Sequence, residues 1–215
     1  MPNVIARGDD GDPGIDGVAG VTDAKAANGK NGVDHWDGDE DPRRGEDGGN
    51  GTRGADGTQG QSATDGSDIV IEVDDFIAGV DVDTRGGKGG NGGAGGTGAN
   101  GQEGGDGGKY ADDNSHAAGG NGGNGGNGGN GGNGGSGGKG GNITVIAKTI
   151  TTGTLNGNAQ GGAGGIGGGA GAGGNSGAGG AGSPNGSTGH AGNNGITGSN
   201  GANGRDGQIV IQQRP

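Results

Sequence analysis

The stretch GGNGGNGGNGGNGGNGGSGGKGG, residues 119–141, repeats the unit Gly-Gly-x without a break. A glycine period of three residues is typical of an extended helix of the polyproline-II type, which has three residues per turn and rises about 3.1 Å per residue. Such a helix has no internal hydrogen bonds, so its N–H and C=O groups need partners on neighbouring segments. The stretch therefore predicts one rod in a bundle of polyglycine-II helices.

Blocks with the same glycine period recur along the whole chain, and all but the first span 22 residues. A flexible linker of biased composition gives no reason for such equal lengths. Equal lengths predict rods that lie side by side. The blocks are 8–20, 45–66, 86–107, 119–140, 161–182 and 186–207.

The glycine content of each block predicts its place in the bundle. Blocks 86–107, 119–140 and 161–182 are rich in Gly-Gly, which leaves two sides open to close neighbours, and we expect them inside. The other three blocks are mostly Gly-x-y with polar x and y residues, and we expect them outside. We expect tight turns between rods at polar and proline-containing positions such as 183–185.

The few β-branched residues gather in short stretches that flank the blocks, at 3–6, 69–82, 143–155 and 208–213. If consecutive rods alternate in direction, all four stretches fall at the same end of the bundle. The sequence thus predicts one domain over residues 1–215. Its fold class is non-α, an antiparallel bundle of polyglycine-II helices with a small β cap at one end.

Composition limits the possible functions. Of 215 residues 71 are glycine, and Trp, Tyr and Phe occur once each, so the core of an ordinary enzyme domain cannot form. Collagen is excluded because it needs about 15–20% imino acids, whereas this chain has five prolines. The absence of cysteine excludes disulfides and thiolate metal sites. We expect no enzymatic activity.

Charge and hydropathy exclude two kinds of partner. The net charge is −12, and residues 1–84 hold 20 of the 25 acidic residues, so nucleic-acid binding is not expected. No apolar run approaches the ~20 residues that span a membrane, so membrane insertion is not expected either. The first residues have no hydrophobic signal core. Low hydrophobicity and high charge also leave a disordered chain as an alternative, which the equal blocks argue against.

Two sets of residues are candidate sites. Asp37, Asp39 and Asp41 form an acidic stretch of the kind that calcium binds, but Pro42 and Gly48 stand where a calcium-binding EF-hand loop wants glycine and glutamate. A solvated acidic loop is the favoured interpretation, with no cofactor, and calcium is the alternative. The candidate self-association residues are the apolar residues of the cap, namely Val4, Ile5, Ile69, Ile71, Val145, Ile209 and Ile211.

The Gly-Gly-Asn run 119–135 and the Gly-x-y run 186–207 resemble polyglycine-II helix-bundle proteins. These include the glycine-rich antifreeze proteins of snow fleas and the adhesin tips of phage tail fibres. The segment 138–155 looks like the connections between glycine rods in large bacterial surface proteins. The resemblance implies a fold, and it carries no functional residues over to this chain. The antifreeze proteins use disulfides, which this chain lacks.

Three functions remain. The first is a structural protein that self-assembles into an extracellular or cell-surface filament or matrix, with itself as partner, because an open apolar sheet edge invites pairing. The second is a receptor-binding adhesin, which is consistent with a virion protein, with loops 21–44, 108–118 and 183–185 meeting a cell-surface receptor. The third is an ice-binding surface built from regular Thr, Ala and Asn residues.

Overall fold

The computed structural model describes residues 3–22, 24–111 and 115–215. Within these residues there is no α-helix, so the prediction of a non-α fold is confirmed. The regular elements of the described chain are six short strands. They are β1 (Asn3–Ile5), β2 (Ile69–Phe76), β3 (Val80–Asp83), β4 (Ile143–Ile150), β5 (Leu155–Asn158) and β6 (Ile209–Gln213).

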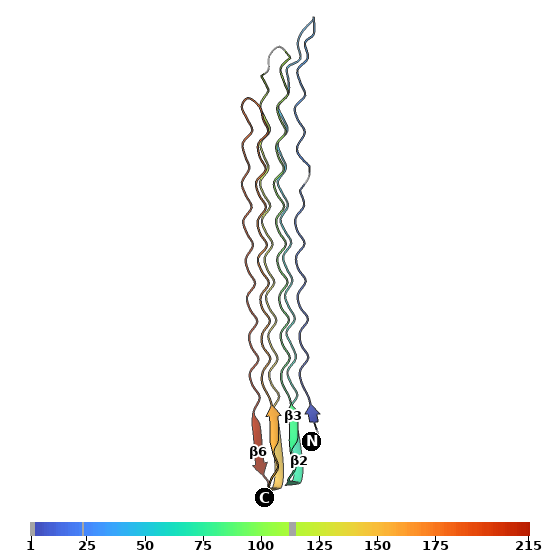
Figure 1. Cartoon of the computed structure of the whole chain (residues 1–215), viewed down its shortest axis with the longest axis vertical. Coiled ribbons are helices and arrows are strands. Elements are labelled where there is room, and N and C mark those ends of the chain that lie inside the picture. Colours follow the sequence, from blue (N-terminus) through green and yellow to red (C-terminus); the bar gives the residue numbers. More distant parts are fainter. Residues whose placement is uncertain (1–2, 23, 112–114) are drawn as a thin grey trace.

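Between the strands lie long glycine-rich segments with neither helical nor strand hydrogen bonding, which we call rods. They run side by side along the length of the molecule, and the strands and both termini gather at one end (Figure 1). Rod 1 is 6–22 with 24–32, rod 2 is 43–67, rod 3 is 84–109, rod 4 is 117–142, rod 5 is 159–181 and rod 6 is 184–208.

Hydrogen bonds between rods repeat at every third residue. On rod 4, the N–H groups of Gly122 and Gly125 donate to the carbonyls of Ser187 and His190 on rod 6, each at 2.8 Å. The residue numbers rise together on both rods, so rods 4 and 6 are parallel. The same pattern joins rods 2 and 4, rods 1 and 3, and rods 3 and 5. Rods 1, 3 and 5 therefore form one layer, and rods 2, 4 and 6 form the other.

The two layers run in opposite directions. The N–H groups of Gly90 and Gly93 on rod 3 donate to the carbonyls of Gln61 and Thr58 on rod 2, both at 2.9 Å. Here the residue numbers change in opposite directions. Over the described residues, rods 3 and 4 touch four rods each, rods 2 and 5 touch three, and rods 1 and 6 touch two.

Close approach between rods explains the glycine period. A Cβ atom added to Gly96 on rod 3 would lie 2.0 Å from the carbonyl oxygen of Val18 on rod 1. A Cβ atom on Gly129 of rod 4 would lie 1.9 Å from the carbonyl oxygen of Ala55 on rod 2. Real Cβ atoms do not approach backbone so closely, so Gly96 and Gly129 have no room for a larger residue. Most positions that face a neighbouring rod are glycine, with Ala26, Ala63, Ala99 and Gln102 as exceptions.

Two expectations about the rods need correction. The glycine period predicts an end of rod 1 at Gly20, yet its bonds continue to Gly32, because Ala26, Gly29 and Gly32 keep small residues at the three-residue spacing. The Gly-Gly content of block 161–182 predicts a place inside the bundle, yet rod 5 lies at the end of its layer. Rod 5 still contacts rods 3, 4 and 6. Contacts with three neighbours require glycine in both of its rows.

The cap consists of two three-stranded parallel sheets, in the orders β1-β3-β5 and β2-β4-β6. Each strand continues a rod, so the sheets inherit the layer order of the bundle (Figure 1). In the second sheet, Val70, Thr144 and Val210 form one row across the three strands. Its neighbouring row is Ile71, Val145 and Ile211.

The hydrophobic core lies between the two sheets of the cap. Its fully buried members are on the central strand β4, where Ile143, Val145 and Ala147 have no exposed surface. Residues on alternate positions of a strand face the same side, which places these three against the other sheet. The rest of the core is Phe76, Val80, Val82 and Ala159, with Val4, Ile69, Ile71, Val73 and Leu155 packed around it.

Candidate self-association surface

The edge strand β6 exposes apolar side chains. All five of its residues are exposed, with Ile209 at 47%, Val210 at 40% and Ile211 at 44%. β6 lies at the end of the order β2-β4-β6. A sheet edge with exposed β-branched residues is a template for pairing with another strand.

The hydrogen bonds of β6 show which backbone groups face outward. Toward β4, the carbonyl of Gln208 accepts from the N–H of Ile143 at 2.8 Å, and the N–H of Arg214 donates to the carbonyl of Ala147 at 2.9 Å. Successive residues of a strand in a ladder turn their backbone groups to opposite sides. By this alternation the N–H and C=O groups of Ile209 and Ile211 face away from β4.

The predicted self-association residues do not all reach the surface. Val145 is fully buried, because it lies on the central strand and faces the other sheet. Val4, Ile69 and Ile71 pack against the core and are partly buried. Of the remaining three, Ile5 is 67% exposed on β1, and Ile209 and Ile211 are exposed on β6. Sequence reasoning omitted Val210 and Val70, which share the outer row of the sheet β2-β4-β6.

The other three sheet edges are less open to pairing. β1 has three residues, and β5 is the short polar strand Leu155–Asn158. β2 is long, but it carries the three acidic residues Glu72, Asp74 and Asp75. Charged residues on an edge strand oppose pairing with another strand. β6 has the sequence IVIQQ, without a charge.

In contrast, side chains close the outer edge of rod 5. The N–H of Gly164 donates to Oδ1 of Asn203 on rod 6 at 2.9 Å, and the N–H of Gly167 donates to Oδ1 of Asn200 at 2.9 Å. These amide oxygens take the place that a carbonyl of a further rod would occupy. Two similar bonds join Gly161 to Asp206 and Gly173 to Asn194.

The opposite edge of the bundle uses threonine for the same purpose. On rod 1, the N–H groups of Ile15 and Val21 donate to Oγ1 of Thr58 and Thr52 on rod 2, at 2.6 and 2.8 Å. Asp9 makes the same contact with Thr64. Several N–H groups along each edge are thus satisfied within the chain, and there side chains cover the places where another rod would bind.

Asparagine and aspartate also link rods within each layer. Oδ1 of Asn130 on rod 4 accepts from the N–H of Ile196 on rod 6 at 2.9 Å, and Oδ1 of Asp56 on rod 2 accepts from the N–H of Asn130 at 2.5 Å. The bonds from rod 6 to rod 4 recur at the asparagines of the repeat. The acceptors are Asn121, Asn124, Asn127, Asn130, Asn133 and Asn142.

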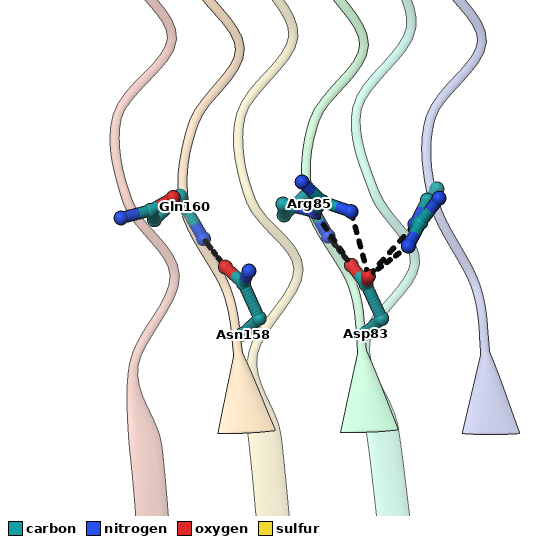
Figure 2. A network of polar contacts seen from close by, with 5 residues as sticks. Asp83, Arg85, Asn158 and Gln160 are labelled. Atoms are coloured by element: carbon teal, nitrogen blue, oxygen red, sulfur yellow. Dashed lines mark hydrogen bonds and ion pairs between the residues drawn. The ribbon is translucent and has the colours of Figure 1, made fainter. Parts of the chain in front are cut away.

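An ion-pair cluster lies where the cap joins the bundle. Asp83 ends β3 and accepts hydrogen bonds from Arg85 at 3.0 Å and from Arg7 at 2.7 Å (Figure 2). Beside it, the N–H of Gln160 donates to Oδ1 of Asn158 at 3.3 Å. Partial burial alone would raise the pKa of Asp83, but the hydrogen bonds from Arg85 and Arg7 outweigh it and hold this pKa well below its usual range.

The acidic stretch lies in the loop at the far end of the bundle, which projects furthest from the cap (Figure 1). Its strand-like bridge joins Val33 and Glu40. The structure does not bring Asp37, Asp39 and Asp41 together. Oδ1 of Asp39 accepts from the N–H of His35 at 3.2 Å, and no group of three acidic or histidine residues able to hold a metal ion occurs in the described chain.

Trp36 is the residue of this loop that sequence reasoning passed over. Its side chain is 98% exposed at the tip, whereas most tryptophans are largely buried. A lone aromatic residue in a polar loop gave no sequence signal of its exposure. Two of the loops considered for an adhesin include residue 23 or residues 112–114, which lie outside the described residues.

Comparison with known proteins gives a sparse result. No protein-family model and no curated protein matches the chain. The chain is similar to a solved springtail antifreeze protein from Granisotoma rainieri, described as a bundle of nine polyproline type II helices whose crystal waters match the ice lattice. The two are 27% identical over 86% of this chain and 92% of that chain, with a TM-score of 0.16.

None of the described residues belongs to a helix long and apolar enough to cross a lipid bilayer.

Proposed function

We propose that this chain is a structural, non-enzymatic protein whose copies associate through the β cap to build an extracellular or cell-surface filament or matrix. The observation that carries the proposal is the difference between the two parts of the molecule. The rod edges are closed by Asn, Asp and Thr side chains, whereas β6 leaves an uncharged apolar edge open. A stiff bundle with one adhesive end is suited to building larger structures.

The proposal includes the conformation of the rods, which we take to be polyglycine-II helices. Two features support it, namely the three-residue repeat of the hydrogen bonds and the glycine at most of the close approaches. In this conformation a 22-residue rod is about 68 Å long, since each residue rises about 3.1 Å. Negative-stain images of isolated molecules should then show straight particles of roughly that length plus the cap.

Sedimentation velocity tests the association, with electron microscopy of the same samples. We expect larger species to form as the concentration rises from about 1 to about 100 μM, the range in which micromolar contacts are populated. Trp36→Ala provides a control at the far end of the molecule and should leave the association unchanged. Monomers over the whole concentration range would refute the proposal.

A receptor-binding adhesin is the second candidate, favoured by the exposure of Trp36. An aromatic side chain that is 98% exposed on a projecting loop resembles the anchor residues of binding interfaces. Binding to cells or to a glycan array should then fall after Trp36→Ala. Equal binding by this variant and the unchanged protein would argue against the loop as the contact.

An ice-binding face is the third candidate, favoured by the outward rows of rods 3 and 5. From Asn91 to Asn100 on rod 3 and from Ala163 to Ala181 on rod 5, every third residue is uncharged and mostly Ala, Thr or Asn. These residues repeat at about 9.3 Å along each rod, three times the rise per residue. A thermal-hysteresis measurement that reads zero would remove this candidate.

A further inference from the structure

We propose that the contact between copies is a twofold pair, in which β6 lies antiparallel to β6 of a second copy. The two caps then join edge to edge, and the two bundles point in opposite directions. This inference rests on the proposed function and names the surface, the partner and the geometry of its first contact.

Side-by-side growth of the bundle is sterically blocked. Parallel copies paired through their caps would be only about 4.7–4.9 Å apart at the strands, which forces their rods together. Rods tolerate such contact only where glycine faces the neighbour, as Gly96 does toward Val18. The outer row of rod 1 instead carries Ile15 and Val21, both more than 70% exposed.

The outer row of rod 6 is blocked in the same way. It carries Asn194, Asn200 and Asn203, whose amide oxygens already accept from rod 5. A neighbouring rod would have to displace these side chains from their hydrogen bonds. A head-to-head pair avoids this conflict, because the two bundles extend from the joined caps in opposite directions and their rods do not meet.

Charge favours β6 over β2, the other edge strand of the same sheet. Pairing β2 with its own copy would bring Glu72, Asp74 and Asp75 close to the same acidic residues of the second copy, and like charges on facing strands are destabilising. β6 has no charged residue between Ile209 and Gln213. It combines β-branched residues, no proline and no net charge, the composition that favours strand pairing.

The hydrogen-bonding pattern of β6 restricts the register, and the apolar residues favour one of the registers it allows. Ile209 and Ile211 turn their backbone groups outward, so an antiparallel partner must place outward-facing residues opposite each other. With Val210 opposite Val210 of the second copy, each Ile209 faces Ile211 of the other chain. This register puts two Ile–Ile pairs on the inner face of the sheet and one Val–Val pair on the outer face. Such apolar cross-strand pairs stabilise a sheet.

A twofold contact of this kind is closed, because both copies use the same surface. The expected product is therefore a pair of rods joined at their caps, about twice as long as one molecule. Filaments or matrices would then be built from these pairs through additional contacts.

Substitutions at Val210 test the pair, with Val70 as the matched control. Val70 lies in the same row of the same sheet, on the opposite edge strand, and is 60% exposed. Val210→Lys places two lysines opposite each other and should weaken pairing about tenfold or more, as should Val210→Glu. An equal mixture of the two variants should restore pairing, because lysine then faces glutamate. Val70→Lys should pair like the unchanged protein.

A cysteine variant gives a second test that does not depend on charge. The chain has no cysteine, so Val210→Cys introduces one thiol per copy. Facing Cβ atoms in an antiparallel pair are about 4.5–5.5 Å apart, close to disulfide distance. With oxidised glutathione, the two thiols should lose two protons and two electrons to form one disulfide, and the glutathione disulfide is reduced to two thiols. Val70→Cys should give far less crosslinked dimer.

The outcomes separate the two proposals. Loss of pairing in Val210→Lys with recovery in the mixture, or selective crosslinking of Val210→Cys, supports the twofold contact. Association that Val210→Lys leaves intact while Val70→Lys abolishes it overturns the β6 contact but leaves the structural function standing. Monomeric behaviour of the unchanged protein at all concentrations overturns both.

Discussion

The Oδ1 atom of Asn203 on rod 6 accepts a hydrogen bond from the backbone N–H of Gly164 on rod 5, at 2.9 Å. A carbonyl of a further rod would occupy this place if the layer continued. The asparagine side chain therefore satisfies the backbone at the edge and also prevents another rod from binding there. This substitution of a side chain for a neighbouring backbone explains how a glycine bundle ends at a defined width.

The edge asparagines should contribute measurably to stability. Asn203→Ala removes the acceptor of the Gly164 N–H, and we expect a loss of about 0.5–1.5 kcal/mol in the free energy of unfolding, the usual net worth of one hydrogen bond. Thr197→Ala, in the same row of rod 6, serves as the control. Denaturant unfolding measures the loss, and faster amide exchange at Gly164 locates it. Equal stability of Asn203→Ala and the unchanged protein would contradict the capping role.

Alanine should be tolerated at a glycine only where the neighbouring space is open. Gly129→Ala would put a methyl group 1.9 Å from the carbonyl oxygen of Ala55, so the rods must separate, and we expect a loss of about 3 kcal/mol or failure to fold. Gly169→Ala is the control, because nothing lies within 4 Å of its added Cβ atom. The ratio of folded yields and the thermal midpoints compare the two variants. Similar midpoints would mean that the rods are not so closely packed.

Acid should weaken the molecule through Asp83. Arg85 and Arg7 lower the pKa of this carboxyl in the folded chain below its ordinary value of 3.8, so the unfolded chain takes up the proton first as pH falls. The stabilisation is complete above about pH 4 and is lost as the pH falls through the lowered pKa. Asp83→Asn should cost about 1 kcal/mol near neutral pH and flatten the acid limb of the stability curve. Unfolding midpoints between about pH 2 and pH 7 measure this effect.

The sequence located the rods because close packing requires glycine at most of the contact positions. Gly96 and Gly129 meet neighbouring backbone, and the period of three follows from that contact. The width of the bundle was harder to predict, since the Gly-x-y pattern of rod 6 does not tell which row faces outward. The roles of Asn203 and Thr58 as caps depend on that row. These capping roles can be recognised only when the offset between the two layers is known.

The cap was predicted as a group of apolar stretches, but the separation of its core from its surface was not. Val145 and Ile211 have similar side chains and are paired across neighbouring strands. One is fully buried and the other is 44% exposed, because β4 is central and β6 is at the edge. Strand order within a parallel sheet depends on the path of the rods. No local pattern in the sequence encodes it.

Thr84 should be the most sensitive polar residue at the junction of rod 3 and the cap. Its side chain is fully buried, and its hydroxyl donates to the carbonyl of Gly141 on rod 4 at 2.7 Å. Thr84→Val keeps the shape but buries that carbonyl without this donor, which should cost about 1–3 kcal/mol. Thr84→Ser keeps the hydroxyl and loses one methyl group, so it should cost about 1 kcal/mol. Denaturant unfolding orders the two variants, and a valine variant at least as stable as the serine variant would show that packing, rather than the hydrogen bond, holds this junction.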